Sequence, residues 1–165
     1  MRYLTLGLLD GIITSVSLTS SLLLRSEALG IRDAVSIALV VAAVNALTVF
    51  LAEYSHQRSS LRDLEYKLAL RSTGKIMRSL VHRRALAGSA RSAAYNFAAS
   101  LAGASFILLP SAISTRLGLI ALIAAVAASS AALARSPEEF GEWLLMIGVS
   151  AAVGFLVGQI FPIAG

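Results

Sequence analysis

The first long apolar run of this 165-residue chain contains a single charged residue, and that residue is an acid. Residues 3–24 are long enough to cross a bilayer, since about 20 residues rising 1.5 Å each span its hydrocarbon core. A carboxylate inside that core costs about 2.5–3.5 kcal/mol on insertion scales unless it is partnered. Asp10 should therefore face a cavity or another helix rather than lipid.

Hydroxyl groups follow Asp10 along one face of the same predicted helix. Thr14, Ser17 and Ser21 stand four, seven and eleven residues after the acid, a spacing that matches the helical period. Such a polar stripe is typical of a face turned toward an aqueous path or a partner helix. We expect Thr14 and Ser17 to line that path.

The composition places the whole chain in a membrane. It is 57% hydrophobic and 14% charged, against about 25% charged in ordinary soluble domains. It has no cysteine, which excludes disulfides and thiolate metal ligands. We therefore predict an all-α integral membrane protein with five transmembrane helices, over residues 3–24, 34–54, 93–113, 117–133 and 143–161.

A basic segment between the second and third spans sets the orientation. Residues 55–91 hold nine of the 14 Lys and Arg residues, and short cytoplasmic loops carry an excess of these residues. Placing this segment inside together with Arg2 and Arg135 leaves three arginines outside. The N-terminus is then cytoplasmic and the C-terminus external, in a multi-pass cell membrane of prokaryotic type. Because the charge lies beside the bilayer, we expect lipid rather than nucleic acid as its partner.

The same segment carries two apolar stripes. Leucines at 61, 64 and 68 form one, residues 76–81 contain the other, and Gly74 lies between them. This pattern predicts a cytoplasmic insert of two short amphipathic helices, or more plainly a basic collar beside the membrane. A later acidic stretch, residues 136–142, is expected to be a loop. The chain then divides into an ion path, the insert and a scaffold of three spans, over residues 1–54, 55–91 and 92–165.

The second span ends with another acid, Glu53. Val49 and Asn45 share its helix face by four- and eight-residue spacing. If the first two spans are antiparallel neighbours, Asn45 lies about 12 Å deeper than Glu53, near the depth of Asp10. These two acids and the amide are our candidate metal ligands, with Val49 lining the path. Alternatively, Glu53 marks the water interface and Asn45 only packs helices together.

Catalytic signatures are missing from the sequence. It contains no zinc-protease HExxH motif, no P-loop and no nucleophile elbow. His56 and His82 have no ligand partners at metal-binding spacing. We do not expect an enzyme or a permanently bound cofactor.

Four segments together resemble the vacuolar iron transporter family. DGIIT at residues 10–14 resembles the family's DG(L/I)(V/I)T, and AEYS at residues 52–55 resembles its GEYxS. GASFILLP at residues 103–110 resembles its GxxxPLLP, and VGFLVG at residues 153–158 its closing VGYxxG. The resemblance follows the whole chain in order.

The resemblance implies a homodimeric five-helix transporter whose path lies between the protomers and is lined by the first and second spans. Members of the family move Fe²⁺, and often Mn²⁺, out of the cytoplasm in exchange for protons. Asp10 would then be the intramembrane ligand and proton carrier, and Glu53 the entrance ligand. Such exchange has a physical basis, because a cation and a proton compete for one carboxylate. The rival interpretation is a non-transporting membrane scaffold or partner subunit that keeps the fold.

The sequence departs from the family pattern in ways that affect metal binding. Val49 stands where the family has a methionine, so the intramembrane site lacks a soft sulfur donor. A site made of Asp10, Asn45 and water oxygens should discriminate poorly between Fe²⁺ and Mn²⁺. The insert offers only Asp63 and Glu65 where the family usually has a glutamate-rich helix bundle. Metal capture in the cytoplasm is therefore expected to be reduced or missing.

Overall fold

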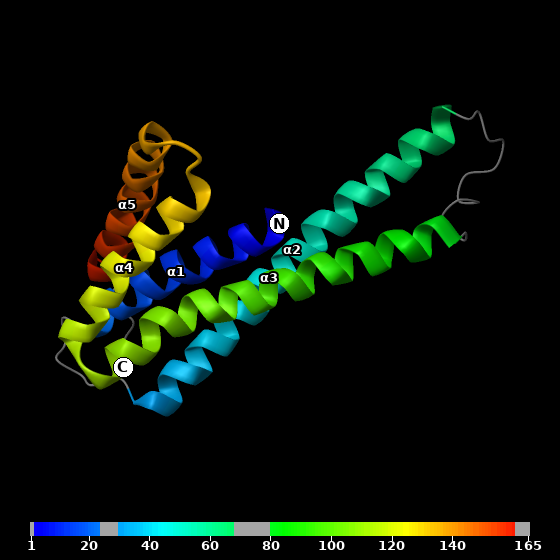
Figure 1. Cartoon of the computed structure of the whole chain (residues 1–165). Helices are drawn as coiled ribbons and strands as arrows, with labels where there is room; N and C mark the ends of the chain where they lie inside the picture. Colours follow the sequence, from blue (N-terminus) through cyan, green and yellow to red (C-terminus); the bar gives the residue numbers. More distant parts are fainter. Residues whose placement is uncertain (1, 24–29, 68–79, 161–165) are drawn as a thin grey trace.

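The computed structural model describes residues 2–23, 30–67 and 80–160, and nearly all of these residues are helical. The predicted all-α class is confirmed for this part of the chain, which Figure 1 shows from blue to red. The described residues form five helices: α1 (Arg2–Leu23), α2 (Ile31–Lys67), α3 (Leu80–Ile113), α4 (Thr115–Leu133) and α5 (Pro137–Ile160).

Counting the described residues alone, three helices (α2, α3 and α4) are long and apolar enough to cross a membrane, while Tyr3–Thr19 in α1 forms a shorter apolar helix. The face of α2 that points away from its neighbours is apolar as well, as expected for a surface in contact with lipid. Its large exposed residues are Leu39, Val40, Val44, Leu47 and Leu51. These features support a membrane protein, and the count of five spans stays a prediction.

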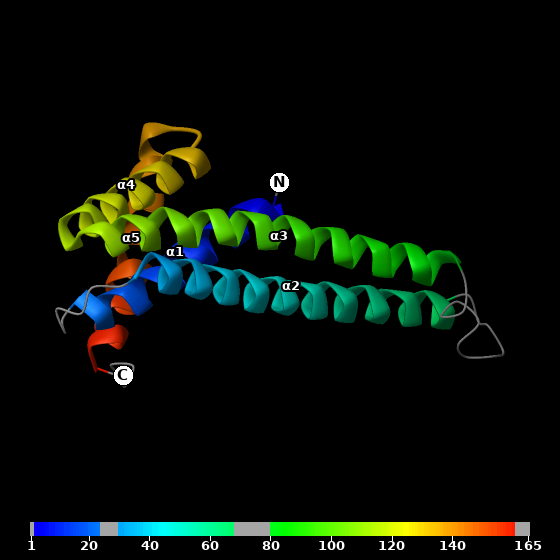
Figure 2. The same ribbon diagram turned by 90° about the horizontal axis from the view of Figure 1, so that it is seen from below.

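The longest unit of the fold is the antiparallel pair of α2 and α3. Figure 2 shows the two helices side by side, and in Figure 1 α2 passes behind α3; in both views they extend at one end beyond the other three helices. Small side chains let their backbones approach closely, which matters in lipid because packing drives helix association there. One buried cluster between them consists of Ala34, Ala38, Val41, Ala104 and Leu108.

The extended part of this pair changes what was predicted for residues 55–91. Helix α2 continues from the predicted second span to Lys67, so the first of the two predicted short helices is the end of α2. Residues 54–67 contain neither glycine nor proline, and nothing in the sequence breaks the helix where it leaves the apolar region. Helix α3 likewise starts at Leu80, well before the predicted third span. Gly74 and most of the second stripe lie outside the described residues.

The acidic stretch that was predicted to be a loop is the first turn of α5. The backbone N–H of Glu139 donates to Ser136 Oγ at 3.2 Å, and Glu139 Oε2 accepts from the backbone N–H of Arg135 at 2.8 Å. Pro137 takes the first helical position, where its missing N–H has no partner to lose. This pair of capping bonds explains why α5 begins at Pro137 rather than near Trp143.

Helix α1 packs most extensively against α3, and glycines make that contact possible. A Cβ atom on Gly7 would lie 2.5 Å from the carbonyl oxygen of Asn96, and one on Gly11 would overlap the carbonyl oxygen of Ser100. Gly103 of α3 meets the backbone of α1 in the same way. No side chain fits at these positions, so the two backbones are in direct contact.

Helix α1 also holds the remaining helices together. It contacts all four of the others, and α4 and α5 lie at the end of the molecule opposite the extended part of α2 and α3 (Figure 2). A second buried cluster joins α1 to α3, α4 and α5, and it consists of Ile12, Val16, Ile107, Ala125 and Ala151.

Replacing Gly11 tests the contact between α1 and α3. We expect Gly11→Ala to destabilise the protein by about 1–3 kcal/mol, because the new methyl group meets the Ser100 carbonyl and the helices must separate. Gly148→Ala is the matched control, since a Cβ atom there has nothing within 4 Å. Thermal unfolding in detergent measures both variants. Equal stability of the two would show that α1 and α3 do not touch at Gly11.

Candidate functional site

The Asp10 carboxylate lies on a side of α1 that is turned away from α3. The neighbouring Gly11 is pressed against Ser100, and successive residues of a helix point about 100° apart. The Asp10 side chain is half-buried. Within the part of the chain that the structure describes, it has no hydrogen-bond or ion-pair partner. This acid is the one charged group of α1 between Tyr3 and Leu23.

Asn45 of α2 lies at the same depth as Asp10. Its Nδ2 atom donates to Ser100 Oγ at 2.8 Å, and the carbonyl of Ser100 is the group that faces Gly11. This is the depth that an antiparallel arrangement of the first two spans predicts. The amide nitrogen is used to hold α2 against α3, so the side-chain oxygen is the atom that Asn45 can offer to a cation.

Glu53 of α2 lies beside the N-terminal end of α1. The hydroxyl of Tyr3 donates to Glu53 Oε2, and Gln57 Nε2 donates to Glu53 Oε1 at 2.8 Å. Tyr3 precedes Asp10 by seven residues, about two helical turns, so both lie on one face of α1. That spacing is the signal that could have singled out Tyr3 from the sequence. Helices α1 and α2 therefore meet in one register, with Tyr3 at Glu53 and Asp10 level with Asn45.

The residues predicted to line the path have different surroundings. Val49 is buried, with 7% of its surface exposed, on the α2 face that carries the amide and the acid. Ser17 faces α5, because a Cβ atom on Gly154 would lie 2.6 Å from Ser17 Oγ. Thr14 of α1 is half-buried, and the side chain of Ser21 lies outside the described residues. The polar stripe therefore reaches α5 at Ser17.

Asn96 of α3 was not singled out from the sequence, and it is fully buried where α1, α2 and α3 meet. In the amide orientation that satisfies both atoms, Oδ1 accepts from the Gly7 N–H at 3.1 Å and Nδ2 donates to the Asn45 carbonyl at 3.3 Å. The signal in the sequence is its position four residues before Ser100, which gives α3 one polar face in an alanine-rich helix.

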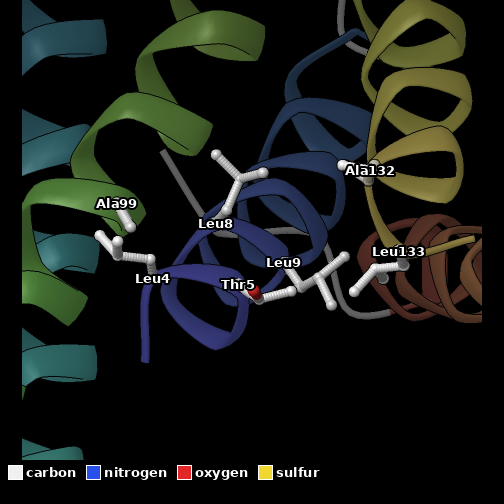
Figure 3. Close-up of a pocket in the computed structure, with 8 residues that line it drawn as sticks. Leu4, Thr5, Leu8, Leu9, Ala99, Ala132 and Leu133 are labelled. Carbon is white, nitrogen blue, oxygen red and sulfur yellow. The ribbon is translucent and has the colours of Figure 1, made fainter. Parts of the chain in front are cut away.

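A cavity of about 280 Å³ lies on the other side of α1 and does not include the acids. Leu8, one of its lining residues, is two positions from Asp10, which places the two side chains on nearly opposite sides of the helix. The walls offer no charge to compensate a cation, so this cavity does not suit an ion. Figure 3 shows the pocket between α1, α3 and α4, lined by Leu4, Thr5, Leu8, Leu9, Ala99, Ser129, Ala132 and Leu133.

The two acids are too far apart to bind one ion together. Tyr3, which contacts Glu53, precedes Asp10 by seven residues and therefore lies about 10 Å from it along α1. Among the residues described, no group of three His, Cys, Asp or Glu side chains is placed to hold a metal ion. The geometry of one chain thus offers two separate acidic positions rather than a closed metal centre.

No protein-family model, curated protein or solved structure matches this chain. The resemblance to the vacuolar iron transporter family therefore stays a prediction that depends on the four sequence motifs.

Asn96→Ala tests the junction of the three helices. We expect it to lower the free energy of unfolding by about 1–3 kcal/mol, because it leaves buried polar groups without their partner. Ser150→Ala is the control, since this exposed hydroxyl donates to Met146 within its own helix, and we expect a change below about 0.5 kcal/mol. Denaturation in mixed detergent measures both variants. A cost for Asn96→Ala as small as that of the control would mean that Asn96 does not join the helices.

Proposed function

We propose that this chain is a transporter that exports divalent metal ions, Fe²⁺ or Mn²⁺, from the cytoplasm in exchange for protons. The observation that supports this proposal best is the half-buried carboxylate of Asp10, which has no partner among the described residues. An acid in an apolar helix is costly, and such acids usually belong to ion or proton pathways. The resemblance of residues 10–14 to the family motif agrees with this role.

The order of the polar groups suggests how an ion would move. Glu53 would receive the cation at the cytoplasmic end, and Asp10 with the Asn45 oxygen would bind it about 10 Å further in. Carboxylate and amide oxygens suit Mn²⁺ and accept Fe²⁺. Because a proton and a cation compete for the Asp10 carboxylate, release of the metal on the far side would be coupled to protonation.

The proposed topology has five spans with the N-terminus inside and the C-terminus outside. The extended part of α2 and α3 would then lie in the cytoplasm, where exposed arginines are favoured. It carries Arg58, Arg62, Arg83, Arg84 and Arg91, all of them exposed. The proposed location is a prokaryotic-type cell membrane, which the chain would cross several times.

A homodimer would complete the ion path. In a two-fold dimer the same surface of each copy faces its partner, so a contact through the Asp10 side of α1 brings two carboxylates to one path. Two carboxylates balance the charge of one divalent cation. One chain alone offers a single acid at that depth, which is the reason to propose the dimer.

The rival proposal is a membrane scaffold that keeps the fold and transports nothing. It is favoured by the hydrogen bonds that already hold Asn45 to Ser100 and Glu53 to Tyr3, because these explain both polar groups without an ion. The flux of Mn²⁺ and Fe²⁺ into proteoliposomes under a pH gradient discriminates the two proposals. A scaffold gives no flux above that of empty liposomes.

Asp10→Asn should abolish exchange and leave the fold intact. The amide has nearly the same shape but cannot titrate, and its burial costs less than that of a charge. The measurements are metal flux under a pH gradient and thermal stability in detergent. Asp63→Asn is the control, since this acid is exposed on the extended part of α2 and its flux should match the wild type. Undiminished flux in Asp10→Asn would remove Asp10 from the mechanism.

Val49→Met should raise the preference for Fe²⁺ over Mn²⁺, which we expect to be weak in the wild type. A thioether is a softer donor than oxygen and suits Fe²⁺ better. Val49→Leu is the matched control, because leucine has nearly the volume of methionine without its sulfur. Competition flux assays measure the preference. If both variants behave alike, or the wild type already selects Fe²⁺ sharply, Val49 does not face the path.

A further inference from the structure

We propose that Tyr3 is a cytoplasmic latch, whose hydroxyl holds Glu53 and must leave it before a cation can reach Asp10. The inference rests on the proposed function for the nature of the cation. The latch itself is a contact between α1 and α2, and it can be tested without measuring transport.

The hydrogen bond of the latch joins two helices that are distant in the sequence. Tyr3 lies in the first turn of α1, and its hydroxyl donates to Glu53 Oε2 across 50 positions of the chain. The other carboxylate oxygen accepts from Gln57, which belongs to the same helix as Glu53. The tyrosine bond is thus the one of these two that ties α1 to α2. Hydrogen bonds to a carboxylate are about twice as strong as those between neutral groups.

The position of the Tyr3 ring means that its bond to Glu53 would block the way of a cation to Asp10. Tyr3 and Asp10 share a face of α1, and Tyr3 lies about 10 Å closer to the N-terminal end. Under the proposed topology that end is cytoplasmic, so the ring stands between the cytoplasm and Asp10. A cation bound at Glu53 would meet the positive end of the tyrosine O–H dipole, which points at the same carboxylate. The cation and the hydroxyl therefore exclude each other.

The rest of α1 allows its first turn to move alone. The close backbone contact with α3 begins at Gly7, whose N–H donates to Asn96 and whose Cα lies against the α3 backbone. Before it, the Tyr3 carbonyl lies 3.5 Å from the Asn96 side-chain amide, at the limit of a hydrogen bond. Before that point, Leu4 and Leu6 are each 43% exposed. Release of Tyr3 would therefore require displacement of about one helical turn, with the glycine contacts left in place.

Cysteine labelling tests the latch cleanly, because the chain has no cysteine of its own. Thr14→Cys places a single thiol on the Asp10 face, deeper than the latch. A membrane-impermeant thiol reagent is applied from the cytoplasmic side to inside-out vesicles. We expect Tyr3→Phe to raise the labelling rate by about tenfold, because the phenylalanine ring cannot hold Glu53.

Two controls separate the latch from general damage. Gln57→Leu removes a bond to the same carboxylate without touching α1, and Tyr66→Phe changes a tyrosine that is 88% exposed. Both should label at the rate of Thr14→Cys alone, and thermal stability confirms that every variant folds. Equal labelling with Tyr3 and with Tyr3→Phe, including no labelling of either, would overturn the latch. Faster labelling in all three variants would overturn it as well.

Added Mn²⁺ distinguishes failure of the latch from failure of the proposed function. If a cation replaces the hydroxyl, Mn²⁺ should raise the labelling rate when Tyr3 is present and have little further effect in Tyr3→Phe. If Tyr3→Phe opens the path but Mn²⁺ changes nothing, the latch stands and Glu53 does not receive metal. If neither Tyr3→Phe nor Mn²⁺ changes labelling, the latch is wrong whatever the flux assays show.

Discussion

The direct backbone contact between α1 and α3 is the constraint on which the rest of the structure depends. Gly7 and Gly11 leave no room for side chains, so they fix both the depth and the rotation of α1 against Ser100 and its neighbours. Since Gly11 adjoins Asp10, the contact that presses the glycine onto α3 also turns the acid about 100° away from it. In α1, the packing of Gly11 against α3 therefore orients the neighbouring Asp10 carboxylate.

The same region of α3 also positions α2. Asn96 reaches Gly7 on one side and the Asn45 backbone on the other, and Ser100 accepts from the Asn45 side chain one turn further along. In lipid such bonds contribute modestly to stability, about 0.6 kcal/mol on average, but their geometry is specific. They set the register that places Tyr3 beside Glu53. The buried hydrogen bonds that α3 makes to α1 and α2 thereby determine which side chains meet along the Asp10 face of α1.

The sequence predicted the helical class and the approximate position of each apolar helix, because hydrophobic runs and their period are local signals. It misplaced the helix ends for physical reasons. The change from apolar to polar residues after Tyr54 marks where the chain leaves the apolar region, and a helix has no need to stop there. The capping bonds of Glu139 turned an expected loop into the start of α5. Asp10, Asn45 and Glu53 were singled out by their spacing. Spacing also puts Tyr3 on the face of Asp10 and Asn96 on the face of Ser100, but their partners on other helices, Glu53 for Tyr3 and Gly7 and Asn45 for Asn96, are long-range contacts that a local pattern does not contain.

The separation of the two acids has a physical logic under the proposed function. A bare carboxylate is costly in an apolar helix, so each step along the path should exchange one compensating partner for another. At Glu53 the exchange would be between a tyrosine hydroxyl and the cation, and at Asp10 between a proton and the cation. If both acids lay together, a divalent ion would bind them at once and leave slowly. A distance of about 10 Å, set by two turns of α1 between Tyr3 and Asp10, keeps the two exchanges separate and allows the ion to pass from one to the next.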